Sequence, residues 1–129
     1  MDLLLDTNVW LRWTAGEGGL SKRSRAAILS RKNRVLFSVA SAWEIAIKYA
    51  LGRLPLPGTP STFVPQWIAR QGFEVLPILI RHATAVADLP LHHRDPFDRL
   101  LIAQASADGL TLVTSDAALL DYDIPIIKA

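Results

Sequence analysis

Apolar and polar positions recur along the chain with two different periods. Short apolar runs predict buried β-strands at residues 1–5, 35–39, 74–78, 110–114 and 124–127. Between them, apolar residues at helical spacing predict helices at residues 9–13, 21–32, 41–51, 61–71, 81–88 and 95–108. A further short helix is expected to begin at Ser115 and Asp116. Strands alternating with helices indicate an α/β fold with a mostly parallel sheet covered on both faces, because right-handed crossovers place helices there.

The stretch from Asp95 to Gly109 carries the clearest helix signals. Asp95 is a typical N-cap, Pro96 suits the first turn, and Gly109 follows the last helical residue. Capping explains Asp95 without any chemistry, and Asp98 is favoured in the first turn by the helix dipole. Pro77 indicates that the third strand ends there or lies at a sheet edge, and the last strand is also expected at an edge.

Composition limits the class of protein. A chain of 129 residues, half of them hydrophobic, is long enough for one domain with a filled core, which we expect over residues 1–129. The absence of cysteine excludes disulfides and thiolate metal sites. The apolar stretch 37–51 is interrupted by Glu44 and Lys48 and is too short to span a bilayer. Asp2 stands where a signal peptide would carry positive charge, so we expect a cytoplasmic protein without a membrane segment.

Charge and aromatic residues add less. The net charge of +2 does not by itself indicate a nucleic-acid partner. Residues 22–34 hold six of the fourteen basic side chains, which either contact phosphate or form the solvated side of a helix; we favour the second.

The three histidines form no spaced ligand set, so we interpret them as surface or loop residues, with general acid–base catalysis left open: His82, His92 and His93. The four tryptophans are interpreted as core or dimer contacts: Trp10, Trp13, Trp43 and Trp67.

Four acidic residues are predicted to meet at one edge of the sheet. Asp6 follows the first strand, and Asp116 follows the strand at 110–114. Glu44 lies in the early turns of the helix after the second strand, and Asp98 in the first turn of its helix. The carboxyl ends of parallel strands and the amino termini of the following helices share this edge. Each acid also has a simpler interpretation, such as a helix cap for Asp6 or an exposed ion pair with Lys48 for Glu44.

Clustered carboxylates repel one another unless a proton or a cation intervenes. A divalent metal removes that repulsion, and all-oxygen ligation suits Mg²⁺ or Mn²⁺. Such a site polarises a phosphodiester and generates hydroxide from bound water. The acids therefore favour hydrolytic nuclease chemistry.

Four segments of the chain, in the same order, resemble the acidic motifs of PIN-domain ribonucleases, specifically the VapC-type toxins of bacterial toxin–antitoxin modules. They are Leu5-Asp6-Thr7-Asn8, Ser41-Ala42-Trp43-Glu44-Ile45, Asp95-Pro96-Phe97-Asp98-Arg99-Leu100-Leu101-Ile102-Ala103-Gln104-Ala105 and Leu112-Val113-Thr114-Ser115-Asp116. The resemblance implies an α/β/α sandwich, dependence on Mg²⁺ or Mn²⁺, endonucleolytic cleavage of RNA and a homodimer. It also implies inhibition by a small antitoxin protein whose tail occupies the acidic groove.

The resemblance assigns roles to individual residues. Asp6, Glu44 and Asp98 would be the main metal-binding acids, with Asp116 as the fourth. The residues expected to orient these acids are Asn8, Thr114 and Ser115, while Asp95 is kept as a helix cap. Possible RNA contacts are Lys48, Arg94 and Arg99, although for Arg99 we favour an ion pair with Asp95 one turn back.

Two other functions remain as alternatives. A phosphotransferase would use Asp6 as a covalent nucleophile, but such enzymes usually carry a second Asp where Asn8 stands. A catalytically silent PIN-like module would bind RNA or a partner protein through the same groove.

Overall fold

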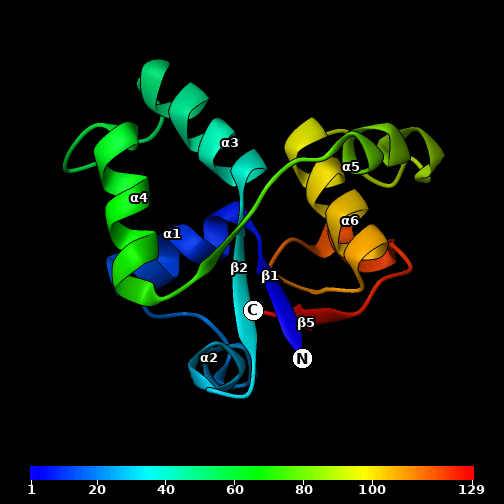
Figure 1. The fold of residues 1–129 in the computed structure, drawn as a ribbon, viewed down its shortest axis with the longest axis horizontal. Coiled ribbons are helices and arrows are strands. Elements are labelled where there is room, and N and C mark those ends of the chain that lie inside the picture. The colour runs from blue at the N-terminus through cyan, green and yellow to red at the C-terminus, as the bar shows by residue number, and fades with distance from the viewer.

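A computed structural model describes residues 1–129, and its centre is a five-stranded sheet. The first two strands of this sheet run through the middle of the view in Figure 1. The strands are β1 (Asp2–Leu5), β2 (Arg34–Ser38), β3 (Glu74–Leu76), β4 (Thr111–Thr114) and β5 (Ile126–Lys128). They lie in the order β3-β2-β1-β4-β5, and every neighbouring pair is parallel. The prediction of an α/β fold with a parallel sheet is confirmed, and β1 occupies the middle.

The buried first strand explains why helices cover both faces. Leu3, Leu4 and Leu5 are fully buried, and alternate side chains of a strand point to opposite faces. Leu3 and Leu5 belong to one apolar cluster, and Leu4 belongs to the other. Burying both faces of one strand in this way requires a layer of helices on each side.

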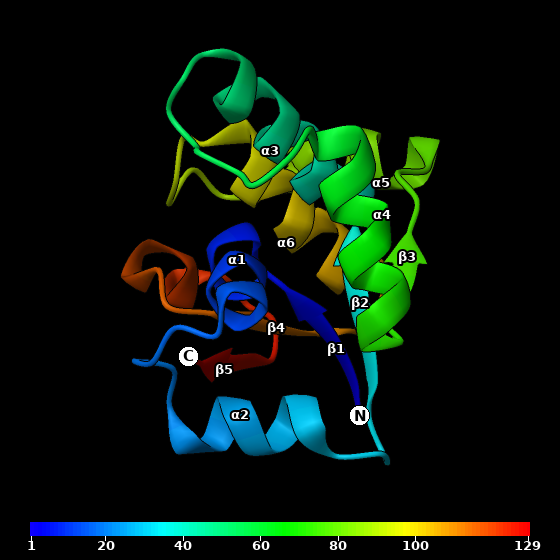
Figure 2. The ribbon, with the colours of Figure 1, turned by 90° about the vertical axis from the view of Figure 1, so that its left-hand side faces the viewer.

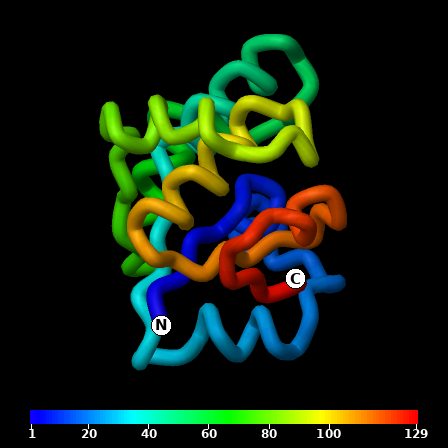
Figure 3. The backbone as a smooth tube through the Cα atoms, turned by 90° about the vertical axis from the view of Figure 1, so that its right-hand side faces the viewer, coloured from blue at the N-terminus to red at the C-terminus, as the bar shows by residue number.

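The helices divide between these two layers (Figures 2 and 3). They are α1 (Thr7–Ala15), α2 (Lys22–Leu29), α3 (Val39–Ala50), α4 (Pro60–Gln71), α5 (Ile80–Ala85), α6 (Pro96–Asp108) and the 3₁₀ helices η1 (Val86–Asp88) and η2 (Ala117–Asp121). Helices α1, α2 and α4 contribute buried residues to the cluster around Trp10, whereas α6 and η2 pack on the opposite face around Leu4. Helix α3 contributes to both clusters through Ile45 and Ala40. None of the helices has the length and hydropathy needed to cross a bilayer.

Most predicted boundaries move by a few residues, three of them as follows. The helix predicted at 21–32 ends at Leu29, where the Asn33 side chain donates to the Ala27 carbonyl and satisfies part of the last turn. The strand predicted at 74–78 stops at Leu76, because Pro77 has no N–H to donate to a ladder. The last strand lies at 126–128 rather than 124–127, and it does form a sheet edge.

The interpretation of His82 as a surface or loop residue is wrong. The side chain is fully buried, its Nδ1 accepts a hydrogen bond from the Leu79 N–H, and its Nε2 lies 3.1 Å from Asp108 Oδ2. Burial would raise the pKa of Asp108, but hydrogen bonds from Arg81 and His82 outweigh it and lower that pKa. His82 therefore fastens α5 to the end of α6.

Candidate active site

Asp6 is both a helix cap and a member of the acidic cluster. Its Oδ1 accepts the N–H of Val9 at 3.1 Å, which caps α1, and its Oδ2 accepts the Thr114 hydroxyl at 2.5 Å. The residue is only 4% exposed, and burial raises its pKa although these hydrogen bonds oppose the rise. The simpler interpretation as a cap is thus correct without excluding a ligand role.

Thr114 connects two of the predicted acids. Its buried hydroxyl donates to Asp6 and accepts the backbone N–H of Asp116 at 3.0 Å. Asp116 in turn caps η2 through its Oδ1, which accepts the N–H of Ala118. The carboxyl ends of β1 and β4 are therefore joined through a single side chain, in the orienting position predicted for Thr114.

Glu44 forms the ion pair with Lys48 that was considered as an alternative, but its carboxylate is buried rather than exposed. It is 4% exposed, and one oxygen, Oε2, lies 2.5 Å from Lys48 Nζ. The other oxygen, Oε1, is buried and has no hydrogen-bond partner. The hydrogen bond that Lys48 donates to Glu44 is the main cause that raises the pKa of Lys48. This lysine is therefore a tethered cation beside the acids. A buried carboxylate oxygen without a partner is costly and points to a missing cation or donor.

A buried pair of hydroxyls lies between the segments that carry Asp6 and Glu44. The Thr7 hydroxyl donates to the Ser41 hydroxyl at 2.8 Å, and both residues are buried. This bond fixes the start of α1 against α3. Sequence reasoning missed it, because nothing in the local pattern brings Thr7 and Ser41 together.

Asp98 is the acid whose ionisation is most perturbed. It lies in the first turn of α6, which Asp95 caps by accepting the N–H groups of Phe97 and Asp98. Burial and then the charge of Asp95 raise the pKa of Asp98 to about 7, with smaller contributions from the charges of Asp6 and Glu44. A hydrogen bond from His93 opposes the rise. The charges of Asp6, Glu44 and Asp98 therefore act on one another in a single site.

His93 is a loop residue, as predicted, but its side chain also joins this site. Its Nε2 lies 2.9 Å from Asp98 Oδ2 and 3.3 Å from Asp116 Oδ2. The only sequence signal was its place in the loop that leads into α6. His92, one residue earlier, instead packs its ring edge-on against Tyr122 with centroids 4.9 Å apart.

Arg99 does not pair with Asp95, so that prediction is wrong. Its guanidinium donates to four backbone carbonyls and one hydroxyl, those of Val86, Leu89, Pro90, His93 and Tyr122. These bonds occupy the group and hold the segment between η1 and α6, which argues against a role in binding RNA. Arg94 is exposed, and its predicted contact with RNA stays a prediction.

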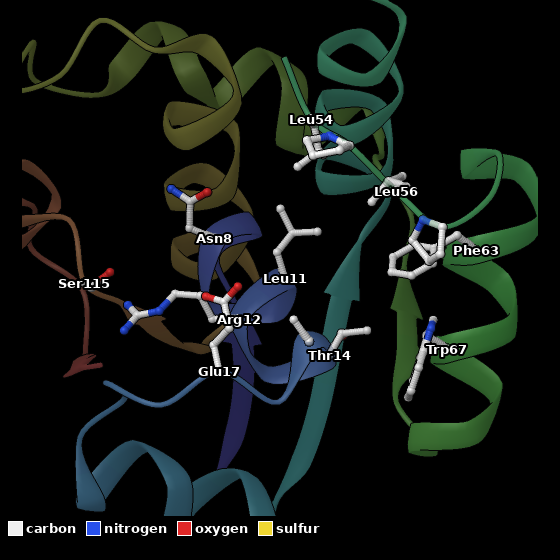
Figure 4. Close-up of a pocket in the computed structure, with 13 residues that line it drawn as sticks. Asn8, Leu11, Arg12, Thr14, Glu17, Leu54, Leu56, Phe63, Trp67 and Ser115 are labelled. Atoms are coloured by element: carbon white, nitrogen blue, oxygen red, sulfur yellow. The ribbon is translucent and has the colours of Figure 1, made fainter. Parts of the chain in front are cut away.

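Asn8 and Ser115 lie beside the acids and make no side-chain hydrogen bond to them. Both line a neighbouring pocket of about 750 Å³ between α1 and α4 (Figure 4). Leu11 from α1 faces Phe63 and Trp67 from α4 across this pocket. The two polar residues thus border an apolar groove that adjoins the carboxylate cluster. Among the other tryptophans, Trp10 is fully buried in the core and Trp43 is exposed.

The donor set fits a divalent cation. Asp6, Glu44, Asp98 and Asp116 supply carboxylate oxygens, and one of these, Glu44 Oε1, has no partner within the protein. Burial is the main cause that raises the pKa of Asp98, and the negative charges of Asp95, Asp6 and Glu44 add to it, all of which a bound cation would oppose. Hard oxygen ligands of this kind suit Mg²⁺ or Mn²⁺.

The chain resembles known proteins in sequence and in fold. It matches the PIN domain family over residues 3–125. Over 60 residues it is 43% identical to Ribonuclease VapC16 of Mycobacterium tuberculosis, a stretch that covers 46% of this chain and 41% of that relative. The match therefore spans less than half of the relative's length.

Solved structures align over nearly the whole chain. VapBC2 from Rickettsia felis, bound to a DNA fragment from its promoter, has a TM-score of 0.75 at 15% identity. The alignment covers 100% of this chain and 99% of that chain. FitAcB from Neisseria gonorrhoeae has a TM-score of 0.65 at 20% identity, and the alignment covers 98% of this chain and 96% of that chain. VapBC-5 from Mycobacterium tuberculosis has a TM-score of 0.62 at 19% identity, and the alignment covers 99% of this chain and 98% of that chain. At these identities the similarity shows a shared fold.

Proposed function

The chain belongs to the PIN domain family, and we propose that it is a metal-dependent endoribonuclease acting as the toxin of a toxin–antitoxin pair. The observation that carries the proposal is the partnerless buried oxygen of Glu44 within a cluster of four carboxylates. A family of nucleases and a buried oxygen that needs a cation together favour hydrolysis over a purely structural role for these acids. The catalytic residues would be Asp6, Glu44, Asp98 and Asp116.

Each acid has a distinct part in this proposal. Asp6 and Asp98 would bind the ion most directly, since the first is buried, the second is partly buried, and both have raised pKa values that a cation would lower. Glu44 would contribute Oε1, and Asp116 would complete the set from the end of β4. Bound Mg²⁺ or Mn²⁺ supplies Lewis acidity toward the phosphodiester and lowers the pKa of a bound water. Thr114 would keep Asp6 oriented through its hydroxyl.

Lys48 and Arg94 would contact the RNA backbone. Lys48 is 43% exposed in its side chain and already lies beside Glu44, so its ammonium is near the place where a scissile phosphate would bind. Arg94 is exposed in the loop that carries His93. Both would add sequence-independent affinity that falls as salt concentration rises.

The proposed protein partner is a small antitoxin whose tail occupies the acidic groove. Support comes from a structural neighbour described as a member of the VapBC family of toxin–antitoxin systems. We also propose a homodimer, because large apolar side chains are exposed on α3, directly after it and on α5, namely Ile47, Leu51 and Ile80. Sedimentation velocity would test the dimer, and a sharp single species at the monomer mass would contradict it.

Cleavage of structured RNA with Mg²⁺ or Mn²⁺ tests the activity. Asp6→Asn and Asp98→Asn should each lower the rate by at least about a hundredfold, since removing one catalytic donor often costs that much. Asp88→Asn, an exposed acid outside the cluster, is the matched control and should retain wild-type activity. Equal rates in all four proteins would contradict the proposal. RNA binding without metal binding or cleavage would instead support the silent binding module.

A further inference from the structure

We propose that His93 is a nitrogen ligand of the metal ion in this site and that it makes the site prefer Mn²⁺ over Mg²⁺. The inference rests on the metal dependence in the proposed function and adds a fifth side chain to its four acids. The ligand atoms of His93, Asp98 and Asp116 all lie within 4.8 Å of one another. One ion can therefore contact all three side chains after only small movements.

The position of the imidazole is fixed by its backbone. The His93 N–H donates to the Tyr122 hydroxyl at 3.1 Å, and the His93 carbonyl accepts from Arg99 at 3.4 Å. Arg99 also holds the carbonyls of Leu89 and Pro90 earlier in the loop. Both backbone groups of His93 are thus anchored, so the fold itself holds this residue beside the carboxylates that its ring contacts.

Glu44 gives independent support. Its Oε1 is buried and partnerless, and its charge contributes to raising the pKa of Asp98, which places it within electrostatic range of the same carboxylates. A cation held by the acids is the partner that this oxygen lacks within the protein.

The chemistry of the ligands decides the metal. Mg²⁺ binds oxygen almost exclusively in proteins and keeps several waters. Imidazole is a ligand of first-row transition ions, to which Mn²⁺ belongs and Mg²⁺ does not, whereas carboxylates suit both ions. A mixed nitrogen and oxygen site should therefore raise the affinity for Mn²⁺ relative to Mg²⁺.

Pulsed electron paramagnetic resonance of the protein loaded with Mn²⁺ tests this directly. The wild-type spectrum should show coupling between the ion and a histidine nitrogen. His93→Gln should lose that coupling and bind Mn²⁺ on the order of tenfold more weakly by calorimetry, with a much smaller change for Mg²⁺. His92→Gln is the matched control, since His92 packs against Tyr122, and it should keep both the coupling and the affinity.

The outcomes separate this inference from the proposed function. Bound Mn²⁺ without nitrogen coupling in the wild type would overturn the role of His93, even if RNA cleavage still required the ion. RNA cleavage that persists in excess chelator, with no ion bound in calorimetry, would overturn the metal-dependent function itself. The wild-type spectrum decides the first question, so a poorly folded His93→Gln protein would not leave it open.

Discussion

At the scale of single residues, Thr114 uses its hydroxyl twice at the junction of β1 and β4. It donates to Asp6 and accepts from the backbone of Asp116. Thr114→Val keeps the shape and removes both bonds, so metal affinity should fall by about ten- to a hundredfold. Thr114→Ser keeps the hydroxyl and should stay close to wild type. Calorimetric titration with Mn²⁺ measures both, and equal affinities in the two variants would show that the hydroxyl does not orient Asp6.

Asp98 should make the metal-free protein less stable as pH rises. Its pKa in the folded state is about 7, above the ordinary value of 3.8. At pH values between these two, the folded state therefore holds a proton that the unfolded state has released. The contribution of protonated Asp98 to the free energy of unfolding is therefore fully present below about pH 4. It is lost as pH rises through 7, by up to about 1.4 kcal/mol per pH unit. Asp6 shifts in the same direction.

Urea unfolding in the presence of a chelator at several pH values measures this loss. Asp98→Asn cannot ionise and should show a flatter profile between pH 5 and about 7.5. If the wild type and this variant lost stability in parallel over that range, the raised pKa of Asp98 would not be the cause.

Sequence reasoning located residues whose position depends on their own strand or helix. Asp6, Asp98 and Asp116 follow from strand ends and a helix start, which local pattern predicts. His93 and Thr7 were missed because their contacts depend on how separate segments meet in space. The burial of Glu44 was not visible in the sequence either, where its spacing from Lys48 fitted an exposed ion pair equally well.

At the scale of elements, Arg99 shows how α6 positions the loop before it. The guanidinium holds four carbonyls between η1 and His93. Spacing along the helix suggested Asp95 as its partner instead, because a partner within one turn is visible in sequence and a folded-back loop is not. The N-terminal turn of α6 therefore supplies both a site acid and the anchor for the neighbouring loop.

Removing that anchor should destabilise the protein and free the loop. Arg99→Met leaves several carbonyls without their charged donor and should cost about 2 to 4 kcal/mol. Hydrogen exchange of residues 86–93 should accelerate more than exchange in β1. Arg94→Met, an exposed neighbour, is the control and should change stability by less than about 0.5 kcal/mol. Uniformly faster exchange over the whole chain would contradict a local anchoring role.

At the scale of the whole molecule, the order β3-β2-β1-β4-β5 brings the acids together. Residues 6 and 116 meet because β1 and β4 are neighbours in register, with Leu5 opposite Val113. The parallel sheet followed from the alternation of strands and helices. The strand order did not, since pairing between distant strands depends on long-range packing that no local pattern encodes.

Metal binding should consequently raise the stability of the entire fold. Two of the four acids lie in α3 and α6, and the other two follow β1 and β4, so an ion that binds them holds these four elements together. An ion at a hundred times its dissociation constant stabilises the folded state by about 2.7 kcal/mol. Differential scanning calorimetry should then show Tm rising by roughly 5 to 15 °C with Mn²⁺.

Variants assign this rise to the proposed site. The double variant Asp6→Asn with Asp98→Asn should lose the response to Mn²⁺, while its Tm without metal should be equal to or above that of the wild type, because a repulsive buried charge has been removed. Asp88→Asn should keep the full response. A rise in Tm that survives in the double variant would place the ion elsewhere and remove the physical basis for the nuclease chemistry proposed at this edge of the sheet.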